Sequence, residues 1–391
     1  TNNIEKKSIV KISIVMVILT VVSKILGFGR EILLAKYYGS SFVIDAYSIA
    51  QSIPNILFGG ILASLSTGFI PVLSNVFSKG SKEADRFTSK LLNIGFIVSF
   101  AVFIICQFCS NFLVRVLAGG FNGEVFTLTC FYVRVVSFFS VLSFGIQILN
   151  SYADFKGKYY VRIVGGYFEN LGVISMIFLS VYAGYHVLIF GMLFGYLMWL
   201  VFDFLQVGKI GYRHSFEIGF DENIREIAKM ALPVFIGSYI NEINTIVDKF
   251  IASRLPEGSI ANLYYGNLLI GTILTFTSTI LNMIIYPKMS RSYVAGDMNG
   301  FTCLVKSSVG VILLITIPCT IAIQLFSNQV IQVVFERGVF VSTSTANSAR
   351  AFALYGLGLV FSAITTLTIS VFYAMKDVRT PLFCSGITVL V

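Results

Sequence analysis

The sequence predicts an all-α protein that crosses a membrane many times. Of its 391 residues, 56% are hydrophobic and only 12% are charged, and the mean hydropathy is +0.84. Soluble domains carry about 25% charged residues. Apolar stretches long enough to cross a bilayer as helices recur along the chain, and basic residues gather in every second connection between them. The classes of soluble protein are therefore excluded.

Ten apolar spans and the start of an eleventh are expected. They cover residues 9–36, 42–77, 89–117, 126–152, 159–183, 187–208, 224–254, 259–287, 302–326 and 346–374, with an incomplete span from 380. Because the last span stops at Val391, we expect the chain to be truncated in or near helix 11. The first apolar run lacks a small-residue cleavage site, which indicates an uncleaved span rather than a signal peptide.

The basic residues predict which connections are cytoplasmic. Clusters of Lys and Arg begin at Lys6, Lys79, Lys156, Lys209, Lys288 and Lys376, whereas the short alternate loops carry none. Membrane proteins retain positive loops in the cytoplasm, so we expect a cytoplasmic N-terminus. The same pattern accounts for the net charge of +9, and no nucleic-acid partner is expected.

The sequence favours neither an enzyme nor a metal protein. Its six cysteines lie in apolar segments, and the Cys106-x-x-Cys109 pair has no second pair and only two histidines to accompany it. Disulfide frameworks and zinc sites need more of these residues at set spacings. A membrane-embedded glycosyl- or acyltransferase would need acids or histidines clustered near one leaflet, and no such cluster is present in the sequence.

Internal similarity predicts two lobes. The segment from Gly39 to Ser74 resembles the segment from Glu257 to Ser290, and Tyr152–Lys156 resembles Tyr373–Asp377 at a similar displacement along the chain. Such weak repeats occur in transporters. We expect a six-helix N-lobe over 1–208, a cytoplasmic linker over 209–223, and an incomplete C-lobe over 224–391, related by an axis along the membrane normal.

The stretch from Ser23 to Glu31 places three charges and two glycines inside the first span. A charge at the bilayer centre costs about 2.5 to 3.5 kcal/mol on insertion scales, so Lys24 and Arg30 are expected to face a cavity, a partner or a substrate. The alternative is that both snorkel to the interface. Gly27 and Gly29 admit a bend that would turn both cations toward one cavity, or they allow close helix packing.

Further ionisable residues lie within the spans: Lys36, Asp45, Arg134, Glu169, Asp203, Glu242, Asp248 and Lys249. Asp45 is the nearest carboxylate partner for Arg30 or Lys24. Glu242 and Asp248, near Asn241 and Asn244, form an oxygen-rich group suited to a small cation or a proton. The alternative is a carboxylate neutralised by Lys249 or by a neighbouring helix.

Several motifs together resemble the MurJ (MviN) family of lipid II flippases. They are Ser23-Lys24-x-Leu26-Gly27-Phe28-x-Arg30-Glu31, Asp45-Ala46-Tyr47, Pro54-Asn55-x-Leu57, Gly258-Ser259-Ile260, Tyr264-Tyr265, Pro287-Lys288-Met289-Ser290, Phe335-Glu336-Arg337-Gly338-x-Phe340 and Phe372-Tyr373-Ala374-x-Lys376-Asp377-x-Arg379-Thr380-Pro381. They follow one another in the family's order along the whole chain.

The resemblance implies the two-lobed fold of the multidrug/oligosaccharidyl-lipid/polysaccharide (MOP) exporters, usually with fourteen helices. It implies a monomer in the bacterial cytoplasmic membrane that flips lipid-linked peptidoglycan precursor by alternating access. Lys24 and Arg30 would hold the pyrophosphate, and Asp45 would orient or release these cations. Asp248 resembles an acid of a sodium site. No bound cofactor is implied, and the coupling ion, Na⁺ or H⁺, or the membrane potential as energy source, stays open.

The chain departs from the family pattern at two cationic positions. Phe58-Gly59 stands where many members have an arginine pair, and Asn267 stands where they have an arginine. These changes keep open an exporter of another lipid-linked oligosaccharide and, more distantly, a cation-coupled drug antiporter. A purely structural membrane scaffold would not explain Lys24, Arg30 and Asp45 at membrane depth.

Overall fold

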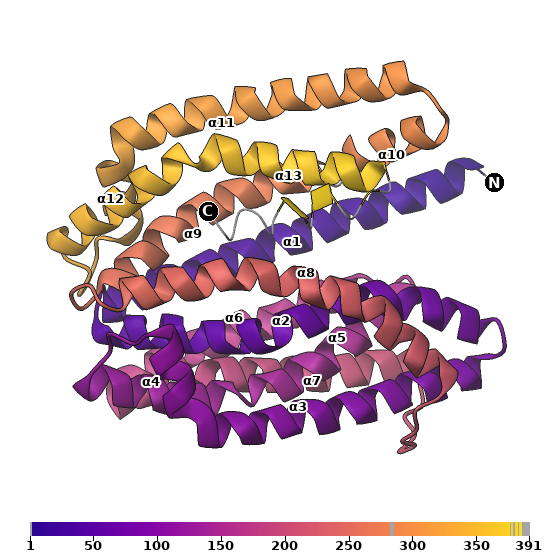
Figure 1. Cartoon of the computed structure of the whole chain (residues 1–391), viewed down its shortest axis with the longest axis horizontal. Helices are drawn as coiled ribbons and strands as arrows, with labels where there is room; N and C mark the ends of the chain where they lie inside the picture. The colour runs from indigo at the N-terminus through magenta and orange to yellow at the C-terminus, as the bar shows by residue number, and fades with distance from the viewer. Residues whose placement is uncertain (1, 282–284, 376, 378–379, 382, 385–391) are drawn as a thin grey trace. The chain divides into compact units, whose positions relative to one another are not determined.

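The computed structural model describes residues 2–281, 285–375, 377, 380–381 and 383–384, with side chains undescribed at 2–14, 63–64, 66–67, 232–241, 243–244 and 280. The described residues fold into helices joined by short connections, as the apolar spans predicted (Figure 1). The chain divides into two compact units. Unit 1 contains residues 1–37 and 46–255, and unit 2 contains residues 38–45 and 256–391.

Unit 1 is built from the first eight α-helices and one 3₁₀ turn. They are α1 (Asn2–Tyr38), α2 (Phe42–Phe77), α3 (Ser81–Leu117), α4 (Gly123–Val136), α5 (Phe139–Phe155), α6 (Tyr160–Ala183), η1 (Tyr185–Val187), α7 (Phe190–Lys209) and α8 (Glu222–Ala252). Among its described residues, one apolar core joins α2, α3 and α5 to the end of α7 and the start of α8, and it includes Phe69 stacked on Phe87.

Unit 2 contains the remaining helices. They are α9 (Ser259–Ile280), α10 (Tyr286–Val294), α11 (Met298–Phe335), α12 (Ser342–Leu357) and α13 (Leu359–Ala374). The side chain of Asp297 accepts a hydrogen bond from Gly300 N and caps α11, a standard use of aspartate at a helix start. Unit 2 also includes the connection between α1 and α2 and the first turn of α2.

The structure confirms helices at the ten predicted spans and changes their details. The span expected over 126–152 is two helices, α4 and α5, separated at Ser137 and Phe138. The span expected over 346–374 is bent by 45° between α12 and α13. Residues 327–335, expected in a loop, continue α11 beyond non-helical backbone at Phe326. The incomplete span from 380 lies mostly outside the described residues.

The helices support a membrane location. Five described helical segments are long and apolar enough to cross a membrane, and the bent α12–α13 pair makes a sixth. The longest stretches of exposed apolar side chains lie along these helices, as on α3 from Ile97 to Phe112. A helix whose apolar face has no protein cover is typical of a lipid-facing position.

The division into units differs from the lobe boundary expected near residue 224. Helix α8 belongs to unit 1, and the division falls between Leu255 and Pro256. The reason is local packing: Ile224 and Ile227 lie in the unit 1 core, and Lys249 Nζ donates to Ser48 O of α2 at 2.9 Å. Compactness does not address the predicted pseudo-symmetry of the lobes, which stays a prediction.

Candidate substrate-binding site

Helix α1, which carries the charged stretch, packs along α6. The contacts run in the same order on both helices: Leu19 O accepts from Tyr167 Oη at 2.6 Å, Arg30 pairs with Glu169, and Tyr37 meets the Phe178 ring edge-on at 5.9 Å. The two helices are therefore parallel. Parallel direction is what the predicted topology requires, because α1 and α6 belong to the first and fifth spans.

Arg30 lies at the centre of a charged cluster with Glu31 and Glu169. Its Nη2 and Nε donate to Glu31 Oε1 at 2.6 and 3.0 Å, and its Nη1 donates to Glu169 Oε1 at 3.2 Å. The side chain of Arg30 is 17% exposed, against 3% for Glu31 and 25% for Glu169. We call these three residues the Arg30 cluster. It stabilises the guanidinium inside the span with charge-assisted hydrogen bonds.

Close packing between α6 and α7 positions Glu169. A Cβ placed on Gly195 of α7 would lie 2.7 Å from Glu169 Cα, and one on Gly172 would lie 2.5 Å from Gly195 Cα. Only glycine fits such an approach, as is common between membrane helices. The buried Tyr47 of α2 lies within electrostatic range of the whole cluster, and Tyr196 of α7 within that of Arg30 and Glu169.

Lys24, the other predicted cation, has an exposed side chain. It lies on the same helix as Arg30, six positions earlier, and α1 runs unbroken through both glycines between them. A Cβ on Gly27 would meet Asn170 at 3.5 Å, an ordinary contact, and a Cβ on Gly29 would meet nothing within 4 Å. Packing therefore does not require glycine at either position, and the bend at Gly27 and Gly29 stays a prediction.

Asp45 lies in unit 2, where its carboxylate caps helix α9. Its Oδ2 accepts from Gly258 N and its Oδ1 from Ala261 N, both at 2.7 Å, and the residue is 3% exposed. Asp45 thus caps the start of a helix that lies far from it in the chain, the role aspartate often plays for its own helix. The sequence suggested Asp45 as a partner for Arg30, but the ion pairs of Arg30 found in the structure are with Glu31 and Glu169.

The connection that carries Asp45 is fixed to α9 by further contacts within unit 2. Ser40 Oγ donates to Asn262 Oδ1 at 2.6 Å, and Tyr265 Oη donates to Gly39 O at 3.3 Å. Gly258 has φ +81°, and a Cβ there would collide with Ser40 O. This positive φ explains the glycine of the Gly258-Ser259-Ile260 motif.

Asp248, the predicted cation ligand, is exposed on α8. Lys249, which the alternative gave as the neutraliser of a carboxylate, donates to Ser48 O and lies within electrostatic range of Glu242. Among the described residues, no three His, Cys, Asp or Glu side chains come together as a metal site would need. The side chains of Asn241 and Asn244 lie outside the described residues, so the cation site at Asp248 stays a prediction.

The Arg30 cluster does not offer an anion a net positive charge by itself. With all three groups ionised its net charge is −1, so an incoming anion must displace a carboxylate or draw on a second cation such as Lys24. A diphosphate offers guanidinium the same paired oxygen acceptors as a carboxylate. Sequence reasoning noted Glu169 as a membrane-embedded acid but gave it no role, and it gave none to Tyr47 or Tyr196.

Comparison with known proteins identifies the family of the chain. A family model described as "Lipid II flippase MurJ" matches residues 34–391. A "Probable lipid II flippase MurJ" of Rhizobium tropici is 29% identical over 389 residues, covering 95% of this chain and 72% of the relative. Another of Rickettsia prowazekii is 28% identical over 384 residues, covering 94% and 74%.

Solved structures show the same fold. The chain is similar to one titled "Lipid II flippase MurJ, inward closed conformation", with TM-score 0.85, 25% identity, and coverage of 96% of this chain and 79% of the other. An inward-facing multidrug resistance MATE transporter of the MOP superfamily matches with TM-score 0.74 at 14% identity, over 94% of this chain and 84% of that one, which shows the fold alone. The chain belongs to the lipid II flippase MurJ family.

Proposed function

We propose that this protein flips lipid II, the undecaprenyl-pyrophosphate-linked peptidoglycan precursor, across the bacterial cytoplasmic membrane by alternating access. The observation that carries the proposal is Arg30, a partly buried guanidinium held inside a span by side-chain carboxylates, in a chain of this family. Burial in a low-dielectric span strengthens the attraction between such a cation and a pyrophosphate.

The cluster suggests how the headgroup is bound and released. Glu169 holds Arg30 with the longer ion pair, 3.2 Å, and is the more exposed of its two carboxylates. The pyrophosphate displaces Glu169, while Glu31 stays on Arg30 and keeps its orientation. Lys24 supplies the second positive charge. When Glu169 returns to Arg30, it competes with the pyrophosphate and favours release.

Helix positions support the two-lobe repeat on which alternating access depends. The displacement from the start of α2 at Phe42 to the start of α9 at Ser259 equals that from α3 at Ser81 to α11 at Met298. The ends of α5 and α13 have nearly the same displacement, and each of these helices follows a partner, α4 or α12, after a short break. With an even number of spans per repeat, both lobes enter the membrane in the same sense, and the basic loops favour a cytoplasmic N-terminus.

A second candidate is an exporter of another lipid-linked oligosaccharide. The position where many family members carry an arginine is occupied by Phe58, a 2% exposed residue within the core, and Asn267 is exposed but uncharged. Fewer cations favour a headgroup with less negative charge. The energy source is either the membrane potential or a cation such as Na⁺ or H⁺, for which Asp248 is the proposed ligand.

Rescue of cells depleted of their own flippase tests the proposal. We expect Lys24→Ala and Arg30→Ala each to abolish rescue while the protein remains in the membrane fraction at normal amount. The matched control is Lys36→Ala, an exposed lysine of the same helix whose Nζ lies 5.2 Å from the centre of the Tyr37 ring, and it should rescue fully. Full rescue by the Lys24→Ala/Arg30→Ala double variant would contradict the proposed site.

A further inference from the structure

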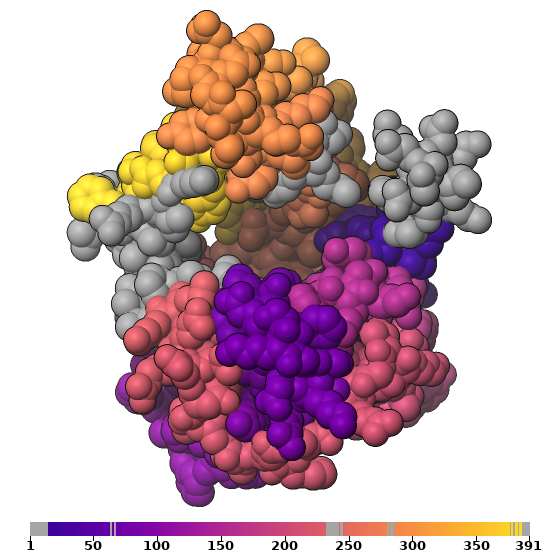
Figure 2. All heavy atoms as spheres, turned by 90° about the vertical axis from the view of Figure 1, so that its right-hand side faces the viewer, coloured from indigo at the N-terminus to yellow at the C-terminus, as the bar shows by residue number. Residues whose placement is uncertain are grey.

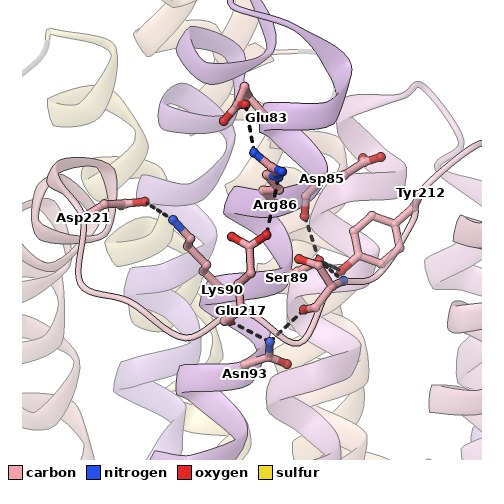
Figure 3. Close-up of polar contacts among 10 residues, drawn as sticks. Glu83, Asp85, Arg86, Ser89, Lys90, Asn93, Tyr212, Glu217 and Asp221 are labelled. Atoms are coloured by element: carbon pink, nitrogen blue, oxygen red, sulfur yellow. Dashed lines mark hydrogen bonds and ion pairs between the residues drawn. The ribbon is translucent and has the colours of Figure 1, made fainter.

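The connection between α7 and α8, residues 210–221, is bound to the first four turns of α3 (Figure 3). Asn93 Nδ2 donates to Ser215 O at 2.9 Å and to Glu217 O at 2.8 Å. Ser89 Oγ accepts from Ser215 N at 3.0 Å. Two ion pairs, Arg86 with Glu217 at 3.4 Å and Lys90 with Asp221 at 3.2 Å, complete the contact. These contacts fix the connection on one side.

The other side of this connection is apolar and uncovered. Phe216, Ile218 and Phe220 are 91%, 64% and 82% exposed. They alternate along the chain with Glu217 and Gly219, and Glu217 pairs with Arg86 of α3, whereas the three apolar side chains are left uncovered. We call Phe216, Ile218 and Phe220 the apolar ridge. Figure 2 shows this end of the molecule, where salmon-coloured atoms near residues 200–230 lie open to the viewer beside the purple α2–α3 region.

The ridge lies where the lipid-facing surface of α3 ends. Residues 97, 100, 104 and 108 follow Asn93 at helical spacing and lie on the same face. They are Ile97, Phe100, Ile104 and Phe108, which are 55%, 49%, 40% and 85% exposed. Helix α3 is one of the segments able to cross a membrane. The ridge therefore continues an apolar stripe that has lipid as its neighbour.

Charge also favours a bilayer as the neighbour of the ridge. The acids of the connection, Glu217 and Asp221, are paired with α3 and turned away from the ridge. Burial lowers the pKa of His214 below its ordinary value, so its imidazole is neutral at pH 7. Aromatic side chains are enriched at the headgroup level of membranes.

We propose that the apolar ridge inserts into the interfacial region of the bilayer leaflet at this end of the helices and anchors the α7–α8 connection there. The connection is then attached on two sides: polar contacts bind it to α3, and the apolar ridge binds it to lipid. The start of α8, capped by Asp221, is kept at the membrane surface.

Tryptophan fluorescence tests the anchor. The chain has one tryptophan, Trp199, so Phe216→Trp and Phe220→Trp in a Trp199→Phe background each report from a single site. The protein is reconstituted in phosphatidylcholine nanodiscs with and without lipid that carries a nitroxide near the headgroup. We expect blue-shifted emission and at least twofold quenching by the nitroxide lipid for both variants.

The matched control is Lys82→Trp, an exposed position on α3 about 16 Å further from the membrane than Asn93 at 1.5 Å per residue. It should emit like a solvated indole and remain unquenched. If Trp199→Phe lowers the yield of folded protein, difference spectra against the parent chain give the same readout. Ridge variants that emit and quench like Lys82→Trp would overturn the proposal, and would leave a protein partner as the occupant of the ridge.

Discussion

Arg30 and Asp45 are both charged residues in helices predicted to span the membrane, and the structure holds them in different ways. Arg30 is bound by two side-chain carboxylates, one of them a quarter exposed. Asp45 is bound by two backbone N–H groups of α9 and is 3% exposed. Side chains can change partners by rotating, whereas the N–H groups of a helix start cannot move without moving the helix.

The difference separates a charge that can be offered to a ligand from a charge that maintains the fold. In the proposed mechanism, Arg30 exchanges the side chain of Glu169 for a phosphate while the helix backbones stay in place. Asp45 would leave two buried N–H groups unpaired if it turned to a ligand, and unpaired buried groups cost about 1–3 kcal/mol each. The structure shows Asp45 attaching the α1–α2 connection to α9, and headgroup binding by Arg30 stays our proposal.

The largest effect on stability is expected from Asp45→Ala. Both caps of α9 are lost, and since hydrogen bonds to charged groups contribute about 1.5–3 kcal/mol each, the loss should be about 3 kcal/mol or more. Thermal unfolding of the detergent-solubilised protein measures it. Asp45→Asn should lose less, because its amide keeps one acceptor oxygen. If Asp45→Ala unfolds at the parent temperature yet loses transport, Asp45 is a ligand residue and the assignment is wrong.

Two smaller effects are expected within the Arg30 cluster, a loss of stability in one variant and tighter lipid II binding in another. Glu31→Gln removes the shorter, more buried ion pair and should lower the free energy of unfolding by about 2 kcal/mol. Glu169→Gln removes the competitor of the headgroup, so lipid II should bind several-fold tighter while its transport slows at release. Native mass spectrometry measures the binding of lipid II, and an assay in liposomes measures its flipping. Together they distinguish tighter binding from slower release. Weaker binding in Glu169→Gln would exclude the exchange mechanism.

The smallest effect on stability is expected from Gly27→Ala. Its new Cβ makes an ordinary contact with Asn170, and alanine favours a helix over glycine by about 1 kcal/mol, so thermal stability should stay level or rise slightly. If α1 bends there during transport, flipping slows in a protein of normal stability. Gly195→Ala is the contrasting control, because its Cβ would collide with Glu169 backbone. Normal flipping in Gly27→Ala would contradict the prediction that α1 bends at Gly27 during transport.

The sequence predicted the helices well and their interruptions poorly. Apolar runs mark spans because each must match the bilayer thickness. The break between α4 and α5 falls at Ser137 and Phe138, with neither proline nor glycine to signal it. The last turns of α11 contain Ser327, Asn328 and Gln329, which lie beyond the span expected over 302–326 and continue the helix. At the α4–α5 break, Gln107 of α3 donates to Arg134 O and Ser137 Oγ, contacts that no local sequence pattern predicts.

The charges of the site were predictable, but their partners were not. Arg30 stood out because charge inside a span is costly. Its partner Glu169 is 139 residues away, and the sequence contains other acids that could have served. The partners of Asp45 are backbone N–H groups, which every residue except proline has, so nothing in the sequence distinguishes them. Only the tertiary structure shows that Arg30 pairs with side-chain carboxylates and that Asp45 accepts hydrogen bonds from a helix backbone.

Native mass spectrometry of the protein with lipid II tests the central claim most directly, namely that Arg30 binds the pyrophosphate headgroup. The account predicts a bound lipid II adduct in the parent protein, reduced at least tenfold in Arg30→Gln and unchanged in Lys36→Ala, with the same lipid co-purifying from bacterial membranes. Equal lipid II binding by the parent protein and Arg30→Gln, or co-purification of a different lipid-linked saccharide, would contradict it.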